Sequence, residues 1–366
     1  MSIQSTAADR RRLAIETLGR ELNTSPSSAA GQLRKMLGHP RPMVVSADID
    51  GLVSAAMLAS VAREWEIVAF VRQSADLVLE PSVATGMPAD LVAIDLYSIN
   101  HDSISNHVVK WGNKQPRLKN LGAAFQAWDQ AVNAAATQHV QAVPSIWAGT
   151  QGCYEDADRP TSSKFKYPLG TAQFLLAMLE VSGHAPKFYD RHYLPWLVAD
   201  CDGGVGSYTR YAYNARIWWP TMASAVGPAS LTEQIFQMVD RMRPHEYLDT
   251  ISALDREVQA SGQTPWLSDD WNLRNTSPST IKTALTWLTE LTGWPDPVRG
   301  GISSLSTWVQ KPVSGSGTVE FKGEKRVTAA TEGNAVAKVS AAAGAINANF
   351  YHGGYSGTRF NWVGGW

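Results

Sequence analysis

The sequence predicts an α/β protein in which helices flank a parallel sheet, followed by a helical connector and a smaller α+β domain. Residues 43–45, 67–71 and 91–94 are short apolar runs that predict buried strands, and residues 52–65 predict a helix that is apolar nearly all round. Apolar strands that alternate with helices are typical of a parallel sheet covered on both faces.

The composition excludes several classes of protein. The 366 residues are 44% hydrophobic and 18% charged, which is enough to bury one or more sizeable cores. A formal charge of −1 excludes the basic field that draws proteins to duplex nucleic acid or anionic membranes. Two cysteines are too few for a disulfide scaffold or a thiolate zinc site, and no apolar run suits a secretory signal or a membrane span. We expect a soluble, cytoplasmic protein with no membrane partner.

Changes of pattern along the chain predict four segments. Residues 1–40 predict an N-terminal helical arm, because a Pro/Ser-rich interruption separates two helical stretches. Residues 41–213 carry the strand and helix alternation of the α/β domain. Residues 214–298 predict a helical connector with turns rich in Pro, Ser and Asp. Residues 299–366 predict the small α+β domain, in which Gly-rich turns frame short strands around one helix.

Two carboxylates follow the first predicted strand directly. Asp48 and Asp50 precede Gly51 and a helix that starts at once. Ligands of open parallel sheets bind beyond the carboxyl ends of the strands, and a helix N-terminus favours a phosphate. Two neighbouring carboxylates repel each other unless a cation lies between them, and oxygen ligands suit magnesium or manganese. The alternative is that one of the two merely caps the helix, and we expect Gly51 to permit a sharp turn.

Further candidate ligands lie later in the chain. Asp95 ends the strand at 91–94, so it belongs to the same sheet edge if the strands are neighbours, although a lone Asp in this place is often a turn former. The segment 101–107 carries two histidines, His101 and His107, and either could add a nitrogen ligand to these acids. Asp200 is preferred as the last acid, but the sequence does not separate it from Asp202.

The order of these features resembles the DHH phosphoesterase superfamily. Residues 48–56 match its D-x-D-G-x-x-S-A segment, Asp95 stands where its second block lies, and residues 106–108 stand at the name-giving Asp-His-His. Residues 170–176 with 197–200 resemble the fourth block and the helix before it. The Gly-rich turn at 352–357 parallels the second domain of the family, which grips the substrate.

The resemblance implies a hydrolase that uses Mn²⁺ or Mg²⁺ to cleave a phosphodiester or phosphoanhydride of a nucleotide or of a short single-stranded nucleic acid, as nucleases of this family do. The metal ligands that it implies are Asp48, Asp50, Asp95, His107 and Asp200. It also implies a catalytic role for Asp48, Asp50 and His107. The substrate contacts that it implies are His352, Gly353, Gly354 and Arg359. An Arg can engage a phosphate bidentately, and a Gly-rich turn lets the backbone approach one.

The sequence also departs from the family pattern. Val44 and Ser46 stand where a further metal ligand is expected, while Asn106 and Val108 replace the acid and the second histidine of the third block. The retained residues complete one metal site, and a second ion is left open. Two alternatives follow: a catalytically degenerate nucleotide-binding or assembly subunit, and a haloacid dehalogenase-like phosphatase with Asp48 as its nucleophile. The oligomeric state is open, with a homodimer among the alternatives.

Overall fold

The computed structural model describes most of the chain. The residues that it describes are 7–72, 76–110, 119–149, 169–187, 198, 201, 212–241, 243, 245–246, 249, 253, 273, 275–321, 329–352 and 358–366. Among them, no helix combines the length and the apolar character that a bilayer span requires.

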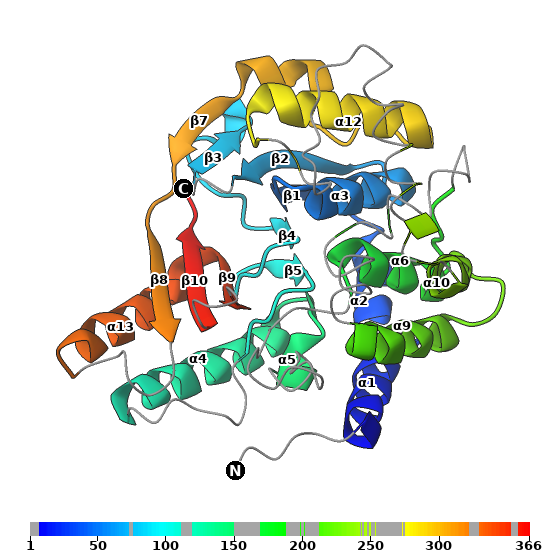
Figure 1. Cartoon of the computed structure of the whole chain (residues 1–366). Coiled ribbons are helices and arrows are strands. Elements are labelled where there is room, and N and C mark those ends of the chain that lie inside the picture. The colour runs from blue at the N-terminus through cyan, green and yellow to red at the C-terminus, as the bar shows by residue number, and fades with distance from the viewer. Residues whose placement is uncertain are drawn as a thin grey trace.

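A mostly parallel sheet of seven strands forms the centre of the protein (Figure 1), which confirms the prediction of an α/β protein with helices on a mostly parallel sheet. Its strand order is β6-β5-β4-β1-β2-β3-β7. The parallel strands are β1 (Arg41–Ser46), β2 (Trp65–Val71), β4 (Val92–Ile94), β5 (Asp102–Ile104) and β6 (Gln141–Ala142). The antiparallel strands β3 (Asp76–Leu79) and β7 (Val309–Pro312) extend one edge.

The chain reverses its direction across the sheet between β1 and β4. From β1 it passes to β2 on one side, and later returns to β4 on the other side before continuing to β5 and β6. In open α/β sheets a crevice forms outside the carboxyl ends of two strands that part in this way, and ligands bind there. The topology therefore places the expected binding position at the carboxyl ends of β1 and β4.

Helices cover one face of the sheet (Figure 1). The helix α3 (Ile49–Val61) packs on β1 and against α6 (Thr171–Val181), and α12 (Pro278–Thr292) lies beside α3. The helices α1 (Ala7–Glu21), α2 (Ala29–Met36), α9 (Ala212–Val226) and α10 (Leu231–Arg241) extend the same core. Alternate residues of β1 divide between two cores: Met43 and Val45 face the helices, and Val44 packs on the opposite face.

A second, antiparallel sheet lies beside the carboxyl ends of β4 and β5 (Figure 1). It consists of β8 (Ser316–Phe321), β10 (Thr358–Gly364) and β9 (Ala345–His352), in that order, with α13 (Ala329–Ala341). An aromatic core joins it to α4 (Lys119–Gln138), where the Phe125 and Phe360 rings meet edge to face at 5.5 Å between centroids. The backbone of β9 also bonds to the first domain, since Phe350 N donates to Val108 O.

Candidate functional site

Three of the predicted acids lie at the carboxyl ends of the neighbouring strands β1 and β4. Asp48 and Asp50 begin α3 immediately after β1, and Asp95 follows β4 directly. Because β1 and β4 are parallel neighbours, their carboxyl ends share one edge of the sheet. The structure thus brings these residues to one edge, as expected from the strand pattern.

Asp48 is the N-cap of α3. Its Oδ1 accepts a hydrogen bond of 2.9 Å from Gly51 N, and its Oδ2 accepts one of 2.5 Å from the Ser46 hydroxyl. The capping interpretation therefore describes Asp48 in this structure, although each carboxylate oxygen has lone pairs beyond these bonds. Gly51 is required for a different reason than the expected sharp turn, because a Cβ at this position would lie 2.3 Å from the Ser46 carbonyl oxygen.

Asp50 caps a helix other than its own. The side chain is buried, with 2% of the residue exposed, and it reaches the N-terminus of α6. Thr171 N donates to Asp50 Oδ2 and Ala172 N donates to Asp50 Oδ1, both at 2.8 Å. Two N–H donors at the positive end of a helix stabilise a carboxylate. Each aspartate of the motif thus caps one helix, Asp48 its own helix α3 and Asp50 the helix α6.

Thr171 links Asp50 to Asp95. Its hydroxyl donates a 2.6 Å hydrogen bond to Asp95 Oδ1 and accepts a 3.0 Å bond from Asn106 N, and its own N–H is held by Asp50. The side chain is completely buried. We call Asp50, Asp95, Asn106 and Thr171 the Thr171 cluster. Thr171 was not predicted as a site residue, because the local sequence indicates only a helix N-terminus after Gly170 and the partners of Thr171 lie far away along the chain.

Asp95 adopts a backbone conformation that few residues tolerate. Its φ is 53°, and among the described residues only Ala229 shares a positive φ without being glycine. Left-handed backbone costs roughly 1–2 kcal/mol for most residues and less for Asp or Asn. Strained residues of this kind gather at functional sites, so the conformation itself supports a role for Asp95.

His107 lies near the same edge of the sheet, two residues after Ser105 at the end of β5. Its carbonyl oxygen accepts a 2.8 Å bond from the Ser145 hydroxyl, and its N–H donates to Ser105 Oγ at 3.1 Å. The side chain is half-buried. The next residue, Val108, forms an isolated bridge with Phe350 of β9, so the segment that carries His107 also touches the second sheet.

The competing histidine, His101, lies at the amino end of the parallel strand β5. It immediately precedes β5, whereas the acids follow the ends of β1 and β4. Burial is the main cause that lowers the pKa of His101, the nearby His139 lowers it further, and Asp102 raises it in part. Of the two assignments, only His107 is compatible with a site that contains Asp50 and Asp95.

The substrate-contact residues belong to the second sheet. Arg359 lies on the central strand β10 and is half-buried, opposite Glu320 of β8 and Tyr351 of β9. His352 ends β9, whose backbone passes Val108 two residues earlier. Gly353 and Gly354 lie outside the described residues, and so do Asp200 and Asp202.

The donor atoms suit a hard divalent cation. Within the described part of the chain, no three His, Cys, Asp or Glu side chains form a group that could hold a metal. Magnesium, however, is often bound by one or two carboxylates together with water and phosphate oxygens. The Thr171 cluster supplies two buried carboxylates, Asp50 and Asp95, and a carboxylate has about four lone-pair sites for its partners. These two residues therefore fit such an ion.

Comparisons of the chain with protein-family models, with curated proteins and with solved structures found no match.

Proposed function

We propose that this protein is a divalent-cation-dependent phosphoesterase that hydrolyses a phosphodiester or phosphoanhydride of a nucleotide or a short single-stranded nucleic acid. The observation that carries the proposal is the pair Asp50 and Asp95, buried together through Thr171 at the carboxyl ends of β1 and β4. Binding crevices of parallel sheets lie at this position, and acids held there suit Mn²⁺ or Mg²⁺.

Each part of the site has a distinct proposed role. We assign the cation to Asp50 and Asp95. Asp48, His107 and Asp200 are the further ligands that the family resemblance implies, but Asp48 and His107 do not gather with the first two into a metal-binding group in the described structure. A bound Mn²⁺ or Mg²⁺ supplies Lewis-acid stabilisation of phosphoryl oxygens and a more acidic water.

The second sheet offers the remaining contacts. We assign His352, Gly353, Gly354 and Arg359 to the substrate, because β9 contacts the segment next to His107 through the Phe350 to Val108 hydrogen bond. A guanidinium group binds phosphate oxygens in pairs, which suits Arg359 for this role.

A second candidate is a catalytically degenerate subunit that binds a nucleotide or another protein. The observation that favours it is that Asp48 and Asp50 each cap a helix, while Asn106 Nδ2 donates to Leu169 O at 3.1 Å. In this candidate the same hydrogen bonds hold α3, α6 and the end of β5 together and serve no catalysis.

Asp95→Asn separates the two candidates. Asn tolerates the left-handed backbone and keeps an oxygen that can accept the Thr171 hydroxyl, so the variant should fold with nearly unchanged stability. A phosphoesterase should lose most of its Mn²⁺-dependent hydrolysis of bis(p-nitrophenyl) phosphate, by about 100-fold or more, because a charged ligand is replaced by a neutral one. Urea denaturation measures the stability, and Glu290→Gln, at an exposed acid on α12, is the matched control.

Three results would decide against the phosphoesterase. They are a wild-type protein without Mn²⁺-stimulated hydrolysis, calorimetry that detects no Mn²⁺ binding, and an Asp95→Asn variant with full activity. Nucleotide binding without hydrolysis would favour the second candidate. A strongly destabilised Asp95→Asn variant would identify Asp95 as a structural residue.

A further inference from the structure

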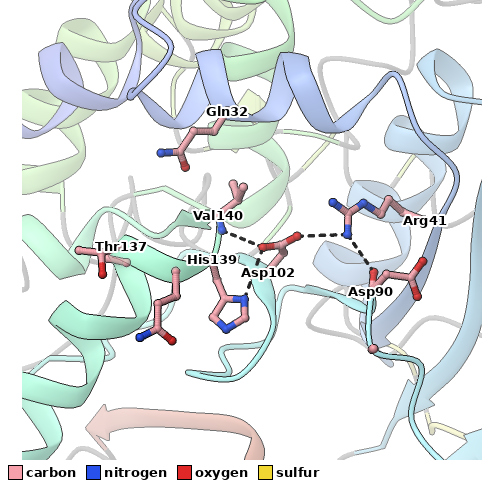
Figure 2. A pocket seen from close by; sticks show the side chains of 10 residues that line it. Gln32, Arg41, Asp90, Asp102, Thr137, His139 and Val140 are labelled. Atoms are coloured by element: carbon pink, nitrogen blue, oxygen red, sulfur yellow. Dashed lines mark hydrogen bonds and ion pairs between the residues drawn. The ribbon is translucent and has the colours of Figure 1, made fainter.

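A second polar site lies at the amino ends of the parallel strands, whereas the acids lie at their carboxyl ends. It is an open cavity of about 570 Å³, a volume typical of small-molecule sites. Side chains from five parts of the fold line it: α2, the beginnings of β1 and β5, the turn before β4, and the end of α4 with the residues that follow it. The polar residues used below are Gln32, Arg41, Asp90, Asp102, Thr137 and His139 (Figure 2).

Asp102 fixes the position of Arg41 in this cavity. Its Oδ1 accepts a 2.7 Å hydrogen bond from Val140 N, and its Oδ2 lies 3.4 Å from Arg41 Nη1. The same Nη1 donates to the carbonyl oxygen of Asp90 at 3.2 Å. The Arg41 side chain is 23% exposed and that of Asp102 is 13% exposed, so the pair is partly shielded from water. The guanidinium group is therefore held in place before any ligand arrives.

Arg41 keeps donors that its neighbours do not use. Nε and Nη2 make no hydrogen bond to the described residues, and both belong to a planar group that matches carboxylate and phosphate oxygens in pairs. In Figure 2, Arg41 lies to the right of Asp102, His139 lies below it to the left, and Gln32 lies above it on α2. His139 directs Nδ1 toward Asp102 at 3.9 Å, and its Nε2 has no hydrogen-bond partner within the described chain.

The opposite wall accepts hydrogen bonds. It is formed by the last residues of α4, whose final carbonyl groups have no helical N–H partner, and the C-terminus of a helix carries partial negative charge. Thr137 Oγ1 already donates to Ala134 O, so it offers only lone pairs to a ligand. A molecule that presents an oxyanion to the free donors of Arg41 and hydrogen-bond donors to the end of α4 matches this lining.

From this arrangement we infer that the cavity binds a small polar molecule that carries a carboxylate or phosphate group beside hydroxyl or amino groups. Arg41 holds the oxyanion, and the end of α4 and the amide oxygen of Gln32 accept the hydroxyl or amino hydrogens. The site is separate from the acids at the carboxyl ends of β1 and β4. It therefore does not depend on the proposed phosphoesterase activity.

Calorimetric titration of the full chain tests this inference. Glycerol 3-phosphate is the phosphate probe and citrate the carboxylate probe, each at matched ionic strength. We expect saturable binding of at least one, weakened about tenfold or more by Arg41→Gln, because a charge-assisted pair of hydrogen bonds is lost. Arg34→Gln, at an exposed arginine on α2 outside the cavity, should bind like the wild type.

A second variant keeps the test decisive if Arg41→Gln fails to fold. Gln32→Leu leaves the pair of Arg41 and Asp102 intact and removes an acceptor from the cavity wall, since the Gln32 Nε2 group donates to Ser27 O and its Oε1 atom is left for a ligand, so it should also weaken binding. The inference is overturned if neither probe binds saturably, or if binding survives in whichever of the two variants folds. The probe that binds more tightly identifies the oxyanion as phosphate or carboxylate.

Discussion

Glu21 is a buried carboxyl group at the end of α1, and it should make the stability of the protein depend on pH. Only 3% of the residue is exposed. Burial raises the pKa of Glu21 from 4.5 to about 7, while a hydrogen bond with the Trp147 side chain and the charge of Arg20 oppose the rise. The guanidinium carbon of Arg20 also lies 4.3 Å from the centroid of the Trp147 ring, so α1 and the short helix α5 (Ser145–Ala148) meet at this group.

The direction of the effect follows from the raised pKa. Between pH 4.5 and about 7 the folded protein retains a proton on Glu21 that the unfolded chain releases, so stability falls as the pH rises through this window. Above pH 7 both states are ionised and the loss is complete. A rise of the pKa from 4.5 to about 7 corresponds to a loss of about 3 kcal/mol, since each tenfold change in proton affinity is worth about 1.4 kcal/mol.

Glu21→Gln removes the titration and keeps an oxygen that can accept the Trp147 N–H. The free energy of unfolding should be measured by urea denaturation at pH 5 and at pH 8 for both proteins. We expect the decrease between the two pH values to be smaller in the variant by up to about 3 kcal/mol. Glu16→Gln, at an exposed glutamate of the same helix, should leave the pH dependence of the wild type unchanged.

The reasoning fails if Glu21→Gln and the wild type lose equal stability between pH 5 and pH 8. It also fails if the wild type loses less stability than Glu21→Gln between pH 5 and pH 8, since all other titrating groups are common to the two proteins. Either result would mean that the carboxyl group ionises in the fold as easily as in the unfolded chain.

Two further predictions, each with a matched control variant, test the packing of the candidate site. Thr171→Val should lower the free energy of unfolding by about 2–5 kcal/mol, because it leaves the buried Asn106 N–H and the Asp95 carboxylate without their hydroxyl partner, and Thr171→Ser should retain most of that stability in the same urea denaturation. Gly51→Ala should lower the free energy of unfolding by about 1–3 kcal/mol, because its Cβ would meet the Ser46 carbonyl oxygen. Gly19→Ala, in open space on α1, should raise it by about 1 kcal/mol. Thermal unfolding measures both variants, and equal changes in their stability would contradict the close approach of Gly51 to Ser46.

Long apolar patterns were sufficient to predict the centre of the sheet. The strands β1, β2 and β4 and the helix α3 lie where their apolar residues indicated, because every one of these elements is buried on both sides. The predicted helix bounds of 52–65 were wrong at both ends, since α3 spans Ile49–Val61 and Trp65 already belongs to β2. The strands β5 and β6 were not predicted. They have three and two residues and contain polar side chains, so their strand state depends on pairing with β4 and not on their own pattern.

The sequence predicted the edge of the sheet on which the acids lie, but not what holds them there. Residues that directly follow parallel strands must share one edge, so the common location of Asp48, Asp50 and Asp95 required only the identification of the strands. The hydrogen bonds of Thr171 with Asp50 and Asp95 join residues 121 and 76 positions apart. No local pattern contains that information, and the physical reason for Gly51, a close approach to Ser46, is equally non-local.

Capping and cation binding make compatible demands on the same carboxylates. A carboxylate has about four lone-pair sites, and Asp50 uses one on each oxygen for the N-terminus of α6. A ligand residue must be held in one orientation before its ion arrives, and the hydrogen bonds of helix N-termini and of a buried hydroxyl provide this restraint. The cap at Asp50 is therefore not evidence against a metal ligand. The decisive distinction is whether the charge of Asp95, which can be removed while its hydrogen bond and backbone are kept, is needed for hydrolysis or only for the fold.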